Sequence, residues 1–365
     1  MSKYNSASNE PESKQKNNVN SEVESTKSQK PMNTQSKEST DSQTLKSTNN
    51  QSEESPSINV YFLGSCHYAY KHPNAGTPFK GNKHVYHEEE NEGTSNFKAY
   101  FTFSGPTALD IKKPTIKSMT RLGIEVLKRF IDEKVEAYKT LKITVNIKGH
   151  SRGAIIAKNV YGELKQSYKS NENIEFGTLS LFDPYAGPLN GYKKTYDNID
   201  IDDADIAVVY SLTEGLYASP SKVKNAKIVI FTDCEHDKTK YIGRAIPTLT
   251  EKGTYYFDGN QEDLRKITVG LKKRPEDLDQ NQNYEEYIKG VYEKIDNYVK
   301  GKIKIINSKN CMKVLKRFSD IKSYSRKETF YGIIAKIEGC KNIVENYLNQ
   351  EKQNRLLKSL GFNSK

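Results

Sequence analysis

The feature that most constrains the fold is one stretch in the middle of the chain, residues 141–161. It consists of an apolar run, the turn Gly149-His150-Ser151-Arg152-Gly153, and a helix-like run. A strand, a sharp turn with glycine at both ends and a helix are the context that a G-x-S-x-G nucleophile elbow requires. A serine at the apex of such a turn sits in strained backbone, and strand and helix pass closely only where no Cβ intervenes. The stretch therefore predicts Ser151 as a nucleophile.

Further apolar runs predict the sheet in which this elbow lies. They cover residues 57–64, 99–103, 174–182, 204–210 and 226–231, and residues 114–138 show helical spacing. Strands that alternate with helices predict a mainly parallel α/β sheet, in which functional residues gather at the carboxyl ends of the strands. The run 141–148 alternates apolar and polar residues, whereas a strand covered on both faces is more uniformly apolar.

Partners for Ser151 are expected at the same edge of the sheet. A serine hydroxyl needs an imidazole to remove its proton and a carboxylate to orient that imidazole. Of the six histidines, His236 alone follows a strand after the elbow. Asp183 directly follows the run 174–182 and is the preferred acid. The alternatives for the acid are Glu214, Asp233 and Asp237. The chain order Ser, Asp, His is the one that α/β-hydrolases use for their catalytic triad.

Two backbone N–H groups are expected to stabilise the oxyanion that forms during ester hydrolysis. One belongs to Arg152, at the N-terminus of the helix after the elbow. The second comes, in this type of hydrolase, from the loop after an earlier strand. Here that loop begins at Gly64, so Ser65 or Cys66 is the expected donor. A plain glycine turn after a buried strand is the alternative for this loop.

Metal, zinc and disulfide sites are not indicated by the sequence, and no metal or organic cofactor is implied. His84 and His87 are three residues apart beside three glutamates, a spacing that metal ligands can have, but we expect a solvated loop over this polar span up to about residue 97. The cysteines are scattered, without C-x-x-C spacing, and we expect them to be reduced packing residues. They are Cys66, Cys234, Cys311 and Cys340.

Residues 1–57 are expected to be a disordered low-complexity tail. They are rich in Ser, Asn, Gln, Lys and Glu, and Tyr4 is their one aromatic residue, so they cannot bury enough apolar surface to offset chain entropy. The start has no charged segment followed by an apolar run, and no apolar stretch of about 18 residues is present. We therefore expect no signal peptide, no transmembrane segment and synthesis in the cytoplasm. Export by a specialised secretion system stays open.

The last part of the chain is basic and helical in character. The net charge of the whole chain is +11, and residues 301–365 contain fifteen Lys and Arg against five Asp and Glu. Helical runs are expected at 284–299, 314–326 and 331–348. A helical addition to the core is one interpretation, and a surface that docks on anionic membrane or another acidic partner is the other. The basic residues considered for that surface are Lys313, Lys316, Arg317, Lys322, Arg326 and Lys327. Nucleic acid is a less suitable partner because no binding motif accompanies the charge.

Two short segments together resemble a known family. GHSRGA at 149–154 and LFDPYAGP at 181–188 are similar to the paired motifs of bacterial α/β-hydrolases related to type VI secretion phospholipase effectors and other pathogen effectors. The resemblance covers about residues 58–245 and implies Ser151 and Asp183 as triad members. Tyr185 stands where the family often has valine. No counterpart of the family's later histidine motif is visible, so His236 depends on strand order.

The sequence as a whole predicts a serine hydrolase. The expected organisation is the tail 1–57, an α/β-hydrolase-like catalytic domain at 58–260 and a basic helical extension at 261–365. The expected substrate is a carboxylic ester, and the resemblance implies a lipid, as in lipases and phospholipases, cleaved through an acyl-enzyme at Ser151. The alternative is a hydrolase-fold protein without activity, which binds anionic membranes or a protein partner through its basic C-terminal region.

Overall fold

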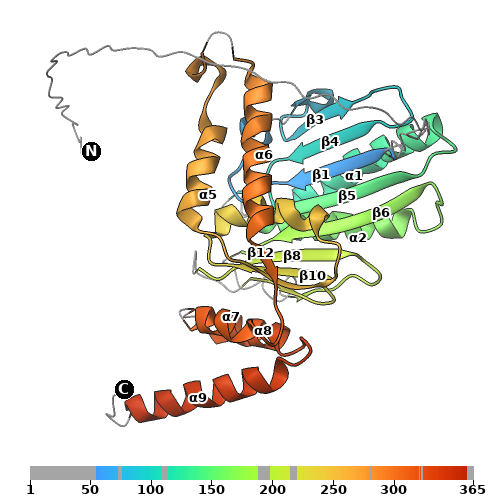
Figure 1. The fold of residues 1–365 in the computed structure, drawn as a ribbon. Coiled ribbons are helices and arrows are strands. Elements are labelled where there is room, and N and C mark those ends of the chain that lie inside the picture. Colours follow the sequence, from blue (N-terminus) through green and yellow to red (C-terminus); the bar gives the residue numbers. More distant parts are fainter. Residues whose placement is uncertain are drawn as a thin grey trace, which may run out of the picture. The chain divides into compact units, whose positions relative to one another are not determined.

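A ten-stranded, mainly parallel sheet organises the computed structural model of this chain (Figure 1). The structure describes residues 55–72, 76–107, 114–187, 198–213, 220–279, 282–319, 321 and 324–359. Helices pack on both faces of the sheet. The predicted α/β class with a mainly parallel sheet is therefore confirmed.

The strands of the large sheet follow one order, β12-β11-β10-β8-β6-β5-β1-β4-β3-β2. The strands from β11 to β4 in this order are mutually parallel, and β12, β3 and β2 pair antiparallel. Their bounds are β1 Ser57–Phe62, β2 Thr77–Pro78, β3 Val85–Glu90, β4 Lys98–Phe103, β5 Ile143–His150, β6 Ile174–Phe182, β8 Ile206–Ser211, β10 Ile228–Thr232, β11 Gly253–Phe257 and β12 Ile303–Ile305. A separate small sheet pairs β7 Asn198–Ile199 with β9 Lys222–Val223.

Two layers of helices bury the two faces of the sheet. The described helices are α1 Ile116–Ala137, α2 Arg152–Ser167, α4 Thr239–Ile242, α5 Gln261–Thr268, α6 Tyr284–Lys302, α7 Cys311–Phe318, α8 Tyr324–Ile334 and α9 Lys341–Ser359. Short 3-10 helices are η1 Ala69–Lys71, η2 Phe79–Gly81, η3 His236–Lys238, η4 Gly243–Thr248, η5 Val269–Lys272 and η6 Pro275–Asp277. One hydrophobic core joins α1, α2, α7 and α8 to the sheet, and a second core on the other face joins α4, η4, α5 and α6 to it. Figure 1 shows α1 and α2 behind the sheet and α5 and α6 in front of it.

The order of the strands places a switch point between β1 and β5. From β1 the chain adds β4 on one side, then crosses to the other side for β5, β6, β8, β10 and β11. In open parallel sheets, ligands bind outside the carboxyl ends of the strands at such a point, because the two loops there leave in opposite directions. The two loops at this switch point begin at Leu63 and Ser151.

The alternating pattern of β5 has a physical reason in the structure. Ile143, Val145 and Ile147 are buried on the face that α1 and α2 cover. On the other face, Asn146 donates from Nδ2 to Asn59 Oδ1 at 3.3 Å, and Lys148 lies near Arg244 of η4 and Asp296 of α6. Burial, with the charge of Arg244, lowers the pKa of Lys148. Polar side chains are tolerated on this face because polar groups meet them there.

Two expectations about secondary structure were wrong. The polar span up to residue 97 is not only a loop, because Val85–Glu90 forms β3, where the ring of His87 lies 4.5 Å from that of Phe101. Burial lowers the pKa of His87. Near the C-terminus, the expected helices 314–326 and 331–348 are instead α7, which ends at Phe318, α8, which begins at Tyr324 and ends at Ile334, and α9, which begins at Lys341.

The expected basic docking surface is also wrong in part. Arg326 and Lys327 are buried, so neither can contact a membrane. Lys313 pairs with Asp258 and Arg317 with Asp233, which neutralises part of the remaining charge. Lys322 lies outside the described residues, and Lys316 is exposed.

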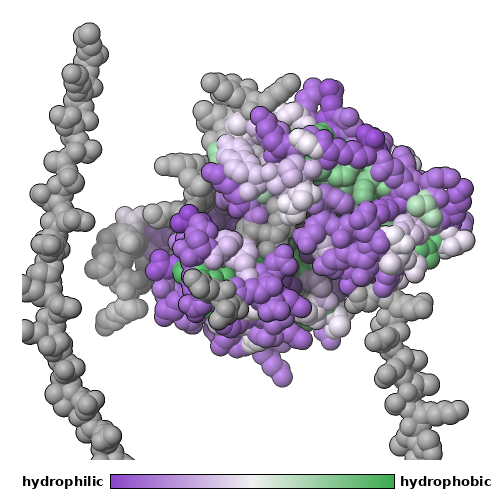
Figure 2. All heavy atoms as spheres, turned by 90° about the horizontal axis from the view of Figure 1, so that it is seen from above, coloured by the Kyte–Doolittle hydropathy of each residue, from purple (hydrophilic) through white to green (hydrophobic). Residues whose placement is uncertain are grey.

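Three observations concern the predicted tail, the membrane and the surface. Most of the predicted tail 1–57 lies outside the described residues, and β1 already begins at Ser57. None of the helices in the described part of the chain is long and apolar enough to cross a bilayer. The face in Figure 2 is mostly hydrophilic, with hydrophobic residues in small separate patches.

Candidate active site

Ser151 stands in strained backbone between β5 and α2. Its φ and ψ are 56° and −125°, a conformation that L-residues rarely adopt and that marks an overdetermined position. The backbone on both sides is tied down. The Ser151 N–H donates to Phe182 O at 2.9 Å, and Ser151 O accepts from the N–H of Ala154 at 3.0 Å. The predicted strand, sharp turn and helix are therefore present, with the serine at the apex.

The glycines at both ends of the turn are required by close backbone contacts, as expected. A Cβ on Gly149 would lie 2.4 Å from Gly153 O, in the first turn of α2. A Cβ on Gly153 would lie 2.3 Å from the carbonyl oxygens of both Phe62 and Leu63, at the end of β1. Without side chains at these positions, α2 can begin directly against the neighbouring strand.

The structure brings Asp183 and His236 together next to the elbow. His236 Nδ1 lies 2.6 Å from Asp183 Oδ2, and the two side chains are 23% and 4% exposed. Because a carboxylate only accepts, Nδ1 carries the hydrogen and Nε2 is left to accept a proton. Asp183 Oδ1 also accepts from the Ser211 N–H at 3.3 Å. The pair thus has the orientation that a general base needs.

The other candidate acids have different partners. Asp233 accepts from the hydroxyl of Tyr256 and pairs with Arg317. Asp237 pairs with Lys238 at 3.0 Å, and its side chain is half exposed. Glu214 lies outside the described residues. Of the three acids in the described part of the chain, Asp183 is therefore the one with a hydrogen bond to His236.

His150, the residue before Ser151, links β5 to His236. Its Nε2 lies 3.0 Å from the carbonyl oxygen of His236, and the two rings are 4.6 Å apart. Burial, helped by the nearby His236 and Lys240, holds the pKa of His150 well below its usual value, so the ring is neutral. Since a carbonyl oxygen only accepts, Nε2 is the nitrogen that carries the hydrogen. His150 therefore fixes the backbone of His236 beside the elbow.

The loop after β1 lies against the elbow. A Cβ on Gly64 would be 2.7 Å from His150 Nδ1 and 3.3 Å from Ser151 Cβ, so the loop can approach only because residue 64 is glycine. The Arg152 side chain is buried and donates from Nε to Ser65 Oγ at 2.6 Å. This hydrogen bond joins the first residue of α2 to the loop that was expected to supply an oxyanion donor.

The two candidate donors in this loop differ in their contacts. The N–H of Cys66 donates to Pro106 O at 2.9 Å, whereas the N–H of Ser65 has no hydrogen-bond partner among the described residues. The backbone N–H of Arg152 lies at the first turn of α2, where the helix dipole favours negative charge. Ser65 and Arg152 are therefore better suited than Cys66 to bind an oxyanion.

The described residues include no hydrogen bond between Ser151 Oγ and His236. Catalytic hydrogen bonds are often long in the absence of substrate and tighten when substrate binds. His150, the residue before Ser151, contacts the backbone of His236, so the two residues belong to the same edge of the sheet.

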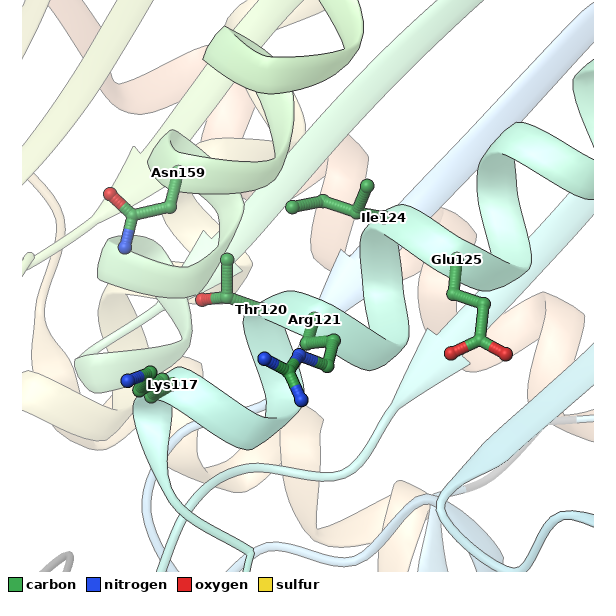
Figure 3. Close-up of a pocket in the computed structure, with 6 residues that line it drawn as sticks. All are labelled: Lys117, Thr120, Arg121, Ile124, Glu125 and Asn159. Atoms are coloured by element: carbon green, nitrogen blue, oxygen red, sulfur yellow. The ribbon is translucent and has the colours of Figure 1, made fainter.

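Other parts of the molecule offer less for catalysis. A groove of about 400 Å³ lies between α1 and α2, and Figure 3 shows its lining side chains. They are Lys117, Thr120, Arg121, Ile124 and Glu125 of α1 and Asn159 of α2. Ser151, Asp183 and His236 do not line this groove. In the part of the chain that the structure describes, no group of three or more His, Cys, Asp or Glu residues could hold a metal ion.

Two residues of the site had no clear signal in the sequence. His150 lies inside the motif, but its contact with His236 depends on how the later loop folds back. Arg326 was assigned to a basic surface, yet its guanidinium is buried and lies 3.9 Å from Asp183 Oδ1. Sequence separations of 86 and 143 residues, respectively, make such contacts invisible to local patterns.

The comparisons with known proteins do not add to these observations. No protein-family model matches the sequence, and no curated protein is similar to it. The function must therefore be inferred from the geometry of the site.

Proposed function

We propose that this protein is a serine hydrolase of the α/β-hydrolase type that cleaves carboxylic esters through an acyl-enzyme at Ser151. One observation carries the proposal. A serine in strained backbone at a strand-to-helix turn lies at the same sheet edge as a histidine whose Nδ1 is 2.6 Å from a buried carboxylate. Strain of this kind persists where the surrounding structure overdetermines it, and it clusters at active sites.

The proposed reaction uses each group in a defined role. Ser151 Oγ attacks the ester carbonyl while His236 Nε2 takes its proton, and Asp183 stabilises the imidazolium. The N–H groups of Arg152 and Ser65 bind the oxyanion of the tetrahedral intermediate. As this intermediate collapses, the alcohol leaves with the proton from His236. A water molecule, deprotonated by His236, then releases the acid and restores Ser151.

The proposed substrate is a lipid ester. The two motifs that resemble phospholipase effectors favour a lipid ester, and the same resemblance implies a role as an exported effector of a bacterium. The scaffold alternative, in which the basic C-terminal region binds a membrane, loses support because Arg326 and Lys327 are buried.

Labelling with a fluorophosphonate probe tests the proposal, since only an activated serine reacts. We expect the parent protein and the Ser180→Ala variant to be labelled, because Ser180 is a buried serine of β6 outside the site. Ser151→Ala should lose labelling and should lose about 10⁴- to 10⁶-fold in ester hydrolysis. A panel of short-chain and lipid esters then defines the substrate. Equal labelling of the Ser151→Ala variant would contradict the nucleophile assignment.

A further inference from the structure

Arg326 of α8 reaches the carboxylate that orients His236. Its guanidinium Nη2 lies 3.9 Å from Asp183 Oδ1, and the two side chains are 5% and 4% exposed. Nη1 donates to the carbonyl oxygen of Thr213, in the loop after β8, at 3.1 Å. The arginine therefore connects α8 to the ends of both β6 and β8, at the edge where Ser151 also lies.

The position of α8 is fixed by an aromatic cluster. The ring of Phe330 lies 5.0 Å from Phe231 of β10 and 5.3 Å from Tyr210 of β8. Phe318 of α7 joins the same cluster, and all four rings are buried. Because close-packed interiors resist displacement, this cluster fixes α8 on the sheet and Arg326 beside Asp183.

The contact matters because Asp183 is a buried carboxylate. Burial of a charge costs several kcal/mol unless other groups compensate it. The Ser211 N–H contributes one hydrogen bond and His236 Nδ1–H another. At 3.9 Å the guanidinium acts as a charge more than as a hydrogen-bond donor. Without it, these two hydrogen bonds are the compensation that the described contacts give to Asp183.

We propose that Arg326 is a positioning residue of the active site. Its charge stabilises the buried Asp183 carboxylate that orients His236. The inference rests on the proposed hydrolase function and extends it. Helix α8 then contributes to the active site through Arg326, in addition to its packing against the sheet.

The pH dependence of catalysis separates this role from a structural one. The titratable groups that the described contacts place beside His236 are Asp183 after β6 and His150 of β5, and Asp237 and Lys238 follow it in η3. Lys240 of α4 and His67 after β1 act on His150. Removal of Arg326 changes none of them. The imidazolium then gains the full attraction of Asp183, less of His236 can accept a proton at neutral pH, and the acid limb of the kcat/KM profile moves to higher pH.

The test compares Arg326→Met with Lys327→Met. Lys327 is the next residue of α8 and is also buried, but its Nζ donates to Ser319 O at 2.7 Å instead of pairing with Asp183. We expect Arg326→Met to move the acid limb of kcat/KM for a short-chain ester about one pH unit higher, which lowers kcat/KM by about tenfold at pH values below the limb and leaves it unchanged above. Lys327→Met should leave the limb in place, even if it lowers the melting temperature as much. Arg326→Lys, which keeps the charge, should restore part of the rate.

A second measurement does not depend on turnover. In a Ser151→Ala background, the His236 resonance is titrated by NMR with and without the Arg326→Met change. We expect a higher titration midpoint with Arg326→Met and no change with Lys327→Met. An unchanged midpoint with Arg326→Met overturns the role of Arg326. If Arg326→Met raises the midpoint but fluorophosphonate does not label the parent protein with Ser151 intact, the coupling between Arg326 and His236 exists and the proposed hydrolase function is wrong.

Discussion

Replacing Ser151 by glycine is expected to give a more stable protein than replacing it by alanine. Both changes remove the hydroxyl, and neither leaves a broken hydrogen bond of that hydroxyl among the described residues. They differ in the Cβ. At φ 56° and ψ −125° an alanine keeps the strain of the native serine, whereas glycine adopts this conformation at little cost.

The size of the difference follows from two opposing terms. Backbone strain at such a position costs about 1–3 kcal/mol. Glycine gives back about 0.4–1 kcal/mol of this, because it makes the unfolded chain more flexible. The glycine variant should therefore exceed the alanine variant by about 1–2 kcal/mol in the free energy of unfolding. For a chain of this size that is a rise of roughly 1.5–3 °C in melting temperature.

Urea unfolding of the two variants, followed by circular dichroism, measures the difference directly. Ser180 provides the matched control, because it is a buried serine in the regular strand β6. There Ser180→Gly should be less stable than Ser180→Ala by about 0.5–1 kcal/mol. The difference in the free energy of unfolding between the glycine and the alanine variant should thus have opposite signs at positions 151 and 180. If glycine is also the less stable residue at position 151, the strain assigned to the elbow does not exist.

Two further predictions concern the partners of Ser151 and the start of the fold. His236→Ala should lose as much activity on a short-chain ester as Ser151→Ala, whereas Asp183→Asn should keep more, because the carboxylate orients and does not transfer protons; equal rates for Asp183→Asn and the parent would contradict the assignment. Deleting residues 1–51 should leave the melting temperature unchanged, while a deletion to residue 57 should lower it, since Thr144 N–H donates to Pro56 O and β1 begins at Ser57. Scanning calorimetry of both truncations checks this, and a large loss in the shorter deletion would show that the tail packs on the core.

The parts of the fold that could be predicted are those that local sequence determines. The run 141–161 was interpretable because the strand, the glycines and the helix that form the elbow are contiguous. In β6 the expected bounds, 174–182, agree with the structure because the run is rich in apolar and β-forming residues and ends at the turn that begins with Asp183-Pro184. Strand β3 was missed because it lies near the sheet edge with charged residues along it, so its composition is that of a loop.

The choice among candidate acids lay beyond the sequence for a different reason. Asp183 and Asp233 both follow parallel strands, and both therefore lie at the functional edge of the sheet. The difference is that His236 forms its hydrogen bond with Asp183. The position of His236 depends on the packing of η3 and on the contact with His150. The burial of Arg326 depends in the same way on α8 docking across β8 and β10. Contacts between distant segments leave no period in the sequence.

Two corners of the site have the same construction. Ser151 and Asp183 each directly follow a parallel strand, and each has a positive φ. In both cases the N–H still donates to the next strand, from Ser151 to Phe182 O at 2.9 Å and from Asp183 to Val209 O at 2.7 Å. In each case one further inter-strand hydrogen bond forms beyond the last residue of the strand, and this bond holds the strained residue in place. Because the tether uses only the backbone, it does not engage either side chain: the Asp183 carboxylate can accept from Ser211 and His236 while the sheet holds its strained backbone.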